Sequence, residues 1–326
     1  MLSFVKFKTN KMIFFLIYFL GDSILKIICN PNTYAGKARK NWPKFVDAFK
    51  KAGLDFEVEW TKGVNDAIRI VKESVKDHDI ICAYGGDGTV NEIITGIGQT
   101  DFKTTLGILP AGRGNDDAYS LQITNKLDDM VEMLVAKESR TVDCIKVNDG
   151  ERFVVGLVGV GISGNVAEAS LGTKTPFTYT LHLIKNLLTY KNVSMKMTLD
   201  DGKNVKDIKA LDVAIGNGIC AGNKKILCPD AILDDGLLDI TIVGNVGFFE
   251  RFVILGKLGK GTHVKHKKVE QLLAKKVVLE NTSEKDIARH FMGEMYGDFP
   301  YKFECLPKVL KVLKMPNQIL KREGWL

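Results

Sequence analysis

The segment from Gly85 to Glu92, Gly-Gly-Asp-Gly-Thr-Val-Asn-Glu, has the residue types of a phosphate-binding loop. It follows the apolar run Ile80 to Tyr84 and leads into an amphipathic stretch, which predicts the order strand, glycine turn, helix. Glycines let backbone N–H groups crowd an anion without Cβ interference, and a helix start adds unpaired amides and partial positive charge. The segment therefore predicts a phosphate cradle.

Asp87 lies inside this loop, where a carboxylate would repel a phosphate unless it had another purpose. It could carry Mg²⁺, orient a nucleophile or cap the turn, and these uses make phosphoryl transfer the leading hypothesis. The alternative is a Gly-Asp-Gly turn that only joins a strand to a helix.

Two further loops end predicted strands in the same way. Asn30-Pro31 closes a β-branched run, and the segment Leu106 to Asp116 joins a strand to the loop Pro-Ala-Gly-Arg-Gly-Asn. In an open α/β sheet, the loops at the carboxyl ends of parallel strands converge on one crevice, so the three loops can share one ligand.

These motifs resemble those of the diacylglycerol kinase catalytic-domain family of lipid kinases, which includes sphingosine and ceramide kinases and is related to NAD kinases. The family pattern is an early Asn-Pro, then Gly-Gly-Asp-Gly-Thr with Asn-Glu, then Leu-Pro-x-Gly-Thr-x-Asn-Asp, and finally Pro-x-Ala-x-x-x-Asp-Gly-Leu-Leu. Here the last motif runs from Pro229 to Leu238. The ordered set covers nearly the whole chain from residue 25.

The resemblance implies an ATP- and Mg²⁺-dependent enzyme that transfers the γ-phosphoryl group to the hydroxyl of a membrane lipid, with a diacylglycerol-like acceptor. Arg113 stands where the family usually has threonine, and its guanidinium could clamp a phosphate or pair with Asp116. The residues that the resemblance assigns to nucleotide binding are Asn30, Thr61, Gly85, Gly86, Asp87, Gly88, Thr89, Asn91, Glu92, Gly112, Arg113 and Asn115.

The resemblance also implies a metal site, formed by the carboxylate of Asp235 with the backbone carbonyls of Ile232 and Leu237. Hard oxygen ligands of this kind suit Mg²⁺. An Asp-Gly pair between apolar runs is equally a hairpin signal, so a plain turn is the alternative interpretation.

Phosphorylation of an alcohol needs a group that accepts the hydroxyl proton. The family carries this carboxylate in an Asp-Gly-Glu near the C-terminus, where this chain has Met292-Gly293-Glu294. Glu294 is the predicted catalytic base and Asp87 is the alternative. A solvated loop charge is the non-catalytic interpretation of Glu294.

Two other functions stay open. An NAD kinase-like soluble kinase shares Gly-Gly-Asp-Gly, although the Leu-Pro and Asp-Gly-Leu-Leu elements count against it. A catalytically inactive lipid-binding regulatory protein is suggested by the departures at Met292 and Arg113. The G-x-G-x-x-G at Gly159 to Gly164 does not indicate a dinucleotide fold, because no βαβ unit or suitably placed acidic residue follows it.

Hydrophobic periodicity predicts an α/β plus β fold. The first half alternates strands and helices, which predicts a Rossmann-like parallel α/β domain; its strands are expected at 24–29, 56–60, 79–84 and 105–109, and its helices around 42–49, 64–71, 89–98 and 126–137. The second half predicts an antiparallel β domain, a sandwich in the family. Strands are expected there at 140–147, 152–160, 193–199, 206–215, 237–243 and 276–279, with helices only at 177–190 and 247–258.

The predicted domains are an N-terminal extension (1–24), a nucleotide-binding α/β domain (25–139) that the tail 308–326 would complete, and a β-rich lipid-substrate domain (140–307). Residues 12–20 form an apolar run behind three lysines that imitates a signal peptide. The run is too short to span a bilayer and lacks a small-residue cleavage site, so an extension that touches membrane, or a true start at Met12, is expected.

Composition gives the broad class. The 326 residues are 45% hydrophobic and carry a net charge of +7, a modest basic excess that suits nucleotides and membrane lipids alike. Six separated cysteines without a Cys-x-x-Cys pair indicate reduced core residues of a cytoplasmic protein. The lysine-rich run between Arg251 and Glu270 is either a solvated face or a membrane-attracting one. The predicted partners are therefore a membrane lipid and, peripherally, the membrane surface, with no nucleic acid; a homodimer is left open.

Overall fold

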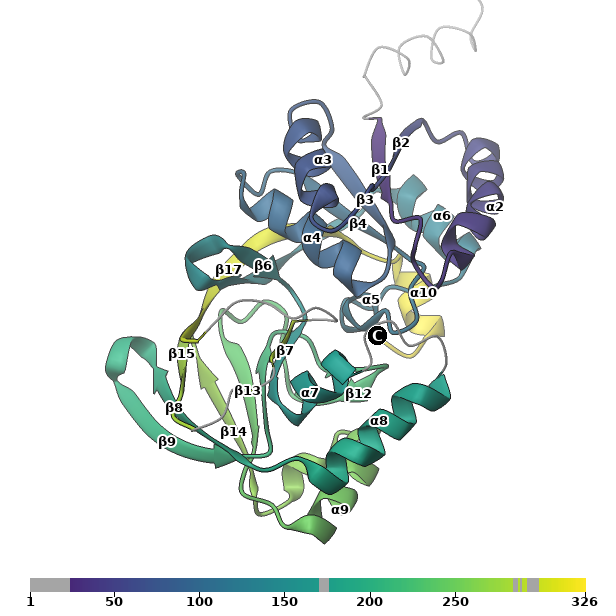
Figure 1. The fold of residues 1–326 in the computed structure, drawn as a ribbon. Coiled ribbons are helices and arrows are strands. Elements are labelled where there is room, and N and C mark those ends of the chain that lie inside the picture. Colours follow the sequence, from purple (N-terminus) through teal and green to yellow (C-terminus); the bar gives the residue numbers. More distant parts are fainter. Residues whose placement is uncertain (1–23, 170–175, 284–286, 288, 292–298) are drawn as a thin grey trace, which may run out of the picture.

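The computed structural model describes residues 24–169, 176–283, 287, 289–291 and 299–326, and Figure 1 shows their arrangement. The first half contains a parallel sheet, as the alternating pattern predicted, and its strands lie in the order β2-β1-β3-β4. Helices α2 and α6 cover one face of it and α3 and α4 the other (Figure 1). These elements are β1 (Leu25–Cys29), α2 (Lys37–Lys51), β2 (Phe56–Trp60), α3 (Asp66–Ser74), β3 (Ile80–Gly85), α4 (Asp87–Gly98), β4 (Thr105–Pro110) and α6 (Leu127–Ala136).

The parallel strands do not end the sheet. The long strand β17 (Tyr301–Leu313) pairs in parallel with β4 at Val312 and Leu106, and it pairs antiparallel with β5 (Ser139–Val147) along most of its length. At its other end β17 pairs with β15 (Lys276–Asn281). One ten-stranded sheet therefore runs through both halves of the chain, and the last strand returns to the first half.

The second half is a sandwich of antiparallel strands. One layer is the far part of the ten-stranded sheet, with β6 (Arg152–Val154), β8 (Val193–Leu199) and β9 (Asn204–Ala210). The other is a five-stranded sheet in the order β14-β13-β10-β7-β16; its strands are β7 (Leu157–Gly161), β10 (Asp212–Gly216), β13 (Leu238–Val243), β14 (Val269–Ala274) and β16 (Arg289–Phe291). Buried apolar side chains of both layers form one core between them.

Two predicted strands are each divided in two. The stretch 206–215 forms the end of β9 and most of β10, which belong to different sheets, and the break falls at Leu211, whose N–H donates to the carbonyl of Val243. The stretch 152–160 is divided between β6 and β7 for the same reason. Such corners, where a chain leaves one layer for the other, keep the apolar alternation on both sides, so periodicity alone did not reveal them.

The remaining elements are short or lie at the rim. Helices α8 (Pro176–Thr189) and α9 (Phe248–Leu258) match their predictions, whereas α5 (Asp116–Ser120), α7 (Ile162–Ala169), α10 (Asn317–Arg322), β14, β16 and β17 were not predicted as such. The hairpin strands β11 (Cys220–Ala221) and β12 (Lys225–Ile226) and the 3-10 turns η1 (Asn148–Gly150), η2 (Asp200–Gly202) and η3 (Thr262–Lys265) complete the chain.

All six cysteines are buried and free, as expected for core thiols. Burial raises the pKa of the Cys82 and Cys228 thiols to about 12, which makes them unreactive. In the part of the chain that the structure describes, every helix is too short or too polar to cross a membrane.

Candidate active site

The two glycine loops meet backbone against backbone at the ends of β3 and β4. The N–H of Ala111 donates to the carbonyl of Gly85 at 2.8 Å. A Cβ atom on Gly112 would lie only 2.6 Å from the Cα of Gly86, and one on Gly85 would lie 2.6 Å from the side chain of Thr89. Among the described residues no side chain caps α4 at Gly86. Glycine is therefore required here by close approach, and the start of α4 stays open to an anion.

The ends of β1 and β2 lie along the same edge of the sheet. The side-chain amide of Asn30 donates to the hydroxyl of Thr89 at 3.1 Å, which joins the end of β1 to the first turn of α4. The N–H of Thr61, just after β2, donates to the carbonyl of Cys29 at 2.9 Å. Asn30, Thr61 and the glycine loops therefore lie at one edge of the sheet. The convergence of the loops after β1, β3 and β4 is what parallel strands predicted, and Figure 1 shows these strands side by side.

The side chain of Asn115 closes the loop after β4 by bonding to the backbone of the same loop. The carboxamide of Asn115 accepts from the N–H of Gly112 at 2.8 Å and donates to the Gly112 carbonyl at 3.2 Å. Arg113 follows Gly112 in the sequence, and its exposed guanidinium lies over the ring of Tyr34, 5.5 Å from the ring centroid. This contact holds a cation beside the site, and only the tertiary structure reveals Tyr34 as its partner.

Three carboxyl groups gather where the two loops meet. Oδ2 of Asp87 and Oδ2 of Asp116 both point at Gly114, where an added Cβ would lie 3.1 Å and 2.9 Å from them. Oδ1 of Asp87 accepts from the N–H of Asp117 at 3.1 Å. Burial, and then the charge of Asp116, raises the pKa of Asp87 to about 6, so this carboxyl is mostly ionised at neutral pH.

Asp117 was not among the predicted site residues. It is fully buried, and neither of its carboxyl oxygens has a hydrogen-bond partner among the residues that the structure describes. Burial, together with the charges of Asp87 and Asp116, raises its pKa well above the ordinary value, so the structure favours the neutral carboxylic acid more than water does. The only signal in the sequence was a second aspartate after the Asn-Asp of the motif, and that signal says nothing about burial.

The β-rich second half of the chain contacts this cluster of three aspartates. Asp116 accepts from the N–H groups of Asn223 at 3.1 Å and of Lys224 at 2.5 Å, both in the turn between β11 and β12. A Cβ on Gly218 would lie 3.0 Å from both the Cα of Gly156 and the hydroxyl of Ser120 in α5. The glycine loops therefore face the second half directly.

The other predicted site residues on α4 differ in their hydrogen bonding. Gly88 lies in the first turn, and the side-chain amide of Asn91 is buried, with neither of its polar atoms hydrogen-bonded to any described residue. Such an orphaned amide is what a missing polar ligand leaves behind. Glu92 instead accepts from the N–H groups of Asn65 at 2.9 Å and Ala67 at 3.1 Å, so its carboxylate holds the start of α3.

The predicted metal loop, Ile232 to Leu237, lies in the second half. Asp235 is exposed, and its Oδ1 accepts from the N–H of Leu237 at 3.0 Å, as in a simple turn. The buried Asp143 supports the loop by accepting from the N–H of Gly236 at 2.6 Å. Among the described residues no group of three or more His, Cys, Asp or Glu side chains has a metal-binding arrangement. A metal at Asp235 would thus rely on one carboxylate and backbone carbonyls.

The predicted base, Glu294, lies outside the described residues, as does Met292. The strand before it, β16, ends at Phe291 opposite Val158 of β7. The assignment of Glu294 therefore continues to rest on the motif.

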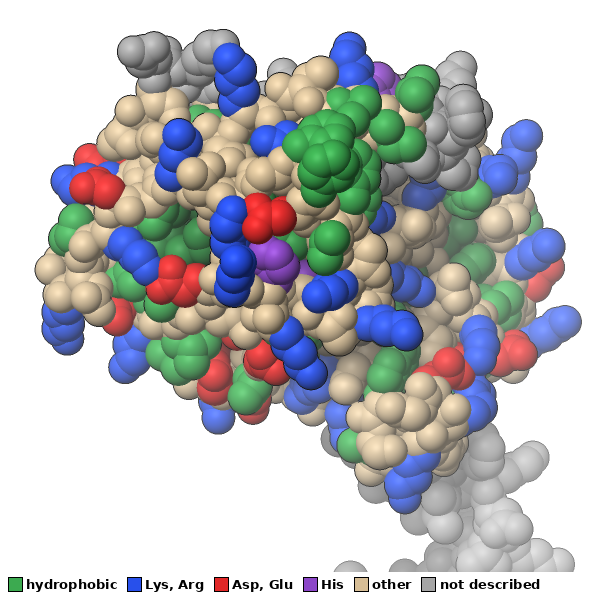
Figure 2. All heavy atoms as spheres, turned by 90° about the horizontal axis from the view of Figure 1, so that it is seen from below, with side chains coloured by type: hydrophobic (Ala, Val, Ile, Leu, Met, Phe, Trp, Pro, Cys, Tyr) green, Lys and Arg blue, Asp and Glu red, His purple; other side chains and the backbone are tan. Residues whose placement is uncertain are grey.

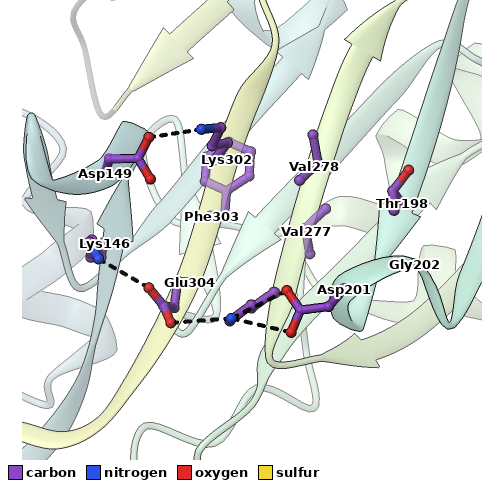
Figure 3. Close-up of a pocket in the computed structure, with 11 residues that line it drawn as sticks. Lys146, Asp149, Thr198, Asp201, Gly202, Val277, Val278, Lys302, Phe303 and Glu304 are labelled. Carbon is purple, nitrogen blue, oxygen red and sulfur yellow. Dashed lines mark hydrogen bonds and ion pairs between the residues drawn. The ribbon is translucent and has the colours of Figure 1, made fainter.

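A cavity of about 420 Å³ lies elsewhere, on the part of the long sheet formed by β5, β8, β15 and β17 (Figure 3). Its charged residues are paired: Lys146 with Glu304 at 3.2 Å, Lys276 with Asp201 at 3.2 Å and Lys302 with Asp149 at 2.8 Å. Since three cations are balanced by three carboxylates, the charged side chains that line the cavity have no excess charge to attract a phosphate or a cation.

Comparison with known proteins agrees with this geometry. Residues 25–147 match the diacylglycerol kinase catalytic domain, and residues 156–314 match the YegS C-terminal NAD kinase beta sandwich-like domain. A diacylglycerol kinase of Staphylococcus aureus is 28% identical over 307 residues, 91% of this chain and 94% of that protein. One of Staphylococcus saprophyticus is 29% identical and covers 91% of this chain and 97% of its own length.

Solved structures give the same result. The crystal structure of a diacylglycerol kinase from Bacillus anthracis has a TM-score of 0.74 and 25% sequence identity, covering 91% of this chain and 98% of its own. The glycine loops, the sandwich and both domain matches lie in the order that the motifs predicted. The chain therefore consists of a diacylglycerol kinase catalytic domain followed by a YegS-type NAD kinase beta sandwich-like domain, and it is a lipid kinase.

Proposed function

We propose that this protein transfers the γ-phosphoryl group of ATP, with Mg²⁺, to the hydroxyl of a diacylglycerol-like membrane lipid. The observation that carries the proposal is the pair of glycine loops in backbone contact, with the uncapped start of α4 and the orphaned amide of Asn91 beside them. An open helix start next to glycine loops is suited to the phosphates of a nucleotide.

The proposed division of labour follows the two halves of the chain. Residues 25–139 with 308–326 hold the nucleotide through Asn30, Thr61, the Gly85–Glu92 segment and the loop of Gly112, Arg113 and Asn115, and residues 140–307 hold the lipid. Fixed amides and a cation placed around the phosphates stabilise charge that develops during transfer. In this proposal residues 1–24 are assigned to neither role.

The donor atoms available suit Mg²⁺. Asp87 is mostly ionised at neutral pH and its Oδ2 faces the Gly114 loop, while Asp235 with the carbonyls of Ile232 and Leu237 offers hard oxygen atoms in the second half. Bound Mg²⁺ would neutralise phosphate charge. In this proposal Asp87 organises the nucleotide and metal, and Glu294 accepts the proton of the lipid hydroxyl.

We propose a cytoplasmic enzyme that meets its substrate as a peripheral protein at the membrane surface, because ATP and the lipid hydroxyl come together only there. The lipid acceptor is inferred from the relatives, all three of which carry the name diacylglycerol kinase.

The test follows radiolabelled γ-phosphate from ATP. The purified protein is incubated with Mg²⁺ and either a short-chain soluble diacylglycerol or NAD, and the products are separated. We expect label in the lipid and none in NADP. Label in NADP would favour a soluble NAD kinase-like enzyme, and label in neither product would favour an inactive lipid-binding protein.

A further inference from the structure

Helix α9 presents an apolar face to solvent. Phe248, Phe249, Phe252 and Val253 are 47%, 80%, 38% and 50% exposed, whereas Ile254 is buried on the inner side of the helix. The ring of Phe248 lies edge-on to those of Phe249 and Phe252, with centroids 5.2 Å and 5.5 Å apart. Three clustered phenylalanines on an outer helix face form an apolar patch that no described residue of the chain covers.

Helix α8 extends this face. Leu181, Ile184 and Leu188, which are 55%, 43% and 50% exposed, follow one another at the spacing of a single helix side. We refer to these three residues and the four exposed residues of α9 as the α8–α9 surface. Figure 2 shows hydrophobic side chains gathered over this end of the molecule, with Lys and Arg around them.

The two helices are fixed to each other. The guanidinium of Arg251 in α9 donates to the carbonyls of Leu187 and Tyr190, at 2.9 Å and 2.8 Å, where α8 ends. A cation on the terminal carbonyls of a helix is favourable for both. The α8–α9 surface is therefore a preformed feature, and α8 in turn contacts α7, which follows β7 of the lipid half.

Most charges in the two segments that form this surface are positive. Between Ala169 and Leu199 the sequence contains Lys but no Asp or Glu. Between Asn245 and Val269 it contains six Lys and Arg and one acid, Glu250, which pairs with Lys268 at 2.6 Å. The exposed Lys260, Lys265 and Lys267 belong to this segment. An apolar centre with a cationic rim complements a bilayer that contains anionic lipids.

We infer that the α8–α9 surface docks on the membrane, with its phenylalanines in the lipid interface and its lysines against anionic headgroups. The inference depends on the proposed function in one respect: the lipid substrate lies in the membrane on which the surface docks. A second copy of the chain is a poorer occupant, because a symmetric contact would press two cationic rims together.

The first test measures co-sedimentation of the purified protein with phosphatidylcholine vesicles, with and without about one third phosphatidylglycerol. The wild type should bind the anionic vesicles better. Phe248→Ser with Phe249→Ser should weaken that binding about tenfold or more, because two large apolar side chains are lost from the interface. Lys260→Glu with Lys265→Glu should remove the preference for phosphatidylglycerol. Val205→Ser, at a 57% exposed position on β9, is the matched control and should change nothing.

A second measurement does not depend on losing binding. The indole introduced by Phe249→Trp should be quenched by brominated lipid, whereas that introduced by Val205→Trp should not. Undiminished vesicle binding by the double phenylalanine variant, or an unquenched indole, would overturn the inference. A wild-type dimer that this variant converts to a monomer would also overturn it, in favour of a second copy.

The proposed function is tested separately. The double phenylalanine variant should phosphorylate the soluble short-chain diacylglycerol at the wild-type rate, since that substrate needs no membrane. If the wild type binds vesicles but has no kinase activity, the proposed function is wrong and the inferred docking surface is unaffected.

Discussion

At the residue scale, Gly86 is the position where one methyl group tests the phosphate cradle. A Cβ there would lie 3.3 Å from the Cα of Gly112, inside the gap between the two loops. We expect Gly86→Ala to weaken ATP binding about tenfold or more while the fold is kept. Titration calorimetry measures the affinity, and Gly259→Ala, where nothing lies within 4 Å of the added atom, is the control. Unchanged affinity in folded Gly86→Ala would exclude this loop as the cradle.

Glu294 and Asp87 compete for the role of base, and kinetics can separate them. Removal of a general base should lower turnover ~10²–10⁴-fold and leave nucleotide affinity intact. Loss of a residue that organises metal and phosphate should damage both. We expect Glu294→Gln to show the first pattern and Asp87→Asn the second, in steady-state kinetics with separate ATP-binding measurements. Near-normal turnover of Glu294→Gln would return the role of base to Asp87.

Asp235 tests whether the second half contributes to Mg²⁺ dependence. In the structure its exposed carboxylate accepts from the N–H of Leu237, a bond that the amide of Asp235→Asn can preserve. If the carboxylate binds metal, this variant should need a higher Mg²⁺ concentration for half-maximal turnover, with Asp234→Asn as the neighbouring control. A metal titration that overlays that of the wild type would reduce Asp235 to a turn residue.

At the scale of elements, Asp212 joins the start of β10 to the start of α7. Its Oδ1 accepts from the N–H of Ser163 at 3.1 Å and from the Ser163 hydroxyl at 2.7 Å. Burial nevertheless dominates and raises the pKa of Asp212 from 3.8 to about 6. Because the folded state binds this proton more tightly than the unfolded state, Asp212 stabilises the fold below about pH 4, and that contribution is lost as pH rises to about 6.

Asp212→Asn should therefore remove a pH-dependent loss of stability of up to about 3 kcal/mol. The amide retains an acceptor for Ser163 and has no charge to desolvate. Urea unfolding at pH 4.0 and pH 7.5 measures the effect: the wild type should lose more unfolding free energy between these values than the variant. Equal pH dependence in the two proteins would show that Asp212 ionises in the fold as easily as in water.

At the scale of the whole molecule, two strands serve both cores. In β17, Phe303 and Cys305 belong to the core of the sandwich, and Leu310, Val312 and Leu313 to that of the α/β half. Strand β5 is divided in the same way, and it pairs with β17 along both parts. Neither half can lose its core without breaking this shared ladder.

We therefore expect one cooperative unfolding transition. Trp42, Trp60 and Trp325 all pack against the core of the α/β half, so tryptophan fluorescence reports that half, whereas far-ultraviolet circular dichroism reports both. Urea transitions followed by the two signals should coincide. A fluorescence transition that is complete while a large dichroism signal persists would mean that the halves unfold independently.

Local signals in the sequence were sufficient to predict the glycine loop and the elements on either side of it. The strand before Gly85, the helix after it and the parallel direction of the first four strands follow from apolar periodicity and glycine placement, which act within a few residues. The motif order also identified the family. By contrast, α5 and α10 are too short for a periodic pattern, and strands that change sheet keep the same alternation across the corner.

By itself, the sequence determined which residues could hold a phosphate and in which order the elements carry them. Only the tertiary structure decided that Gly86 and Gly112 touch, that Asp117 loses all contact with water, and that β17 joins the two halves. It also decided that Phe249 faces solvent. The physical reason is that burial, close approach and shifted pKa values depend on atoms far apart in the chain, whereas periodicity and turn chemistry depend on neighbours.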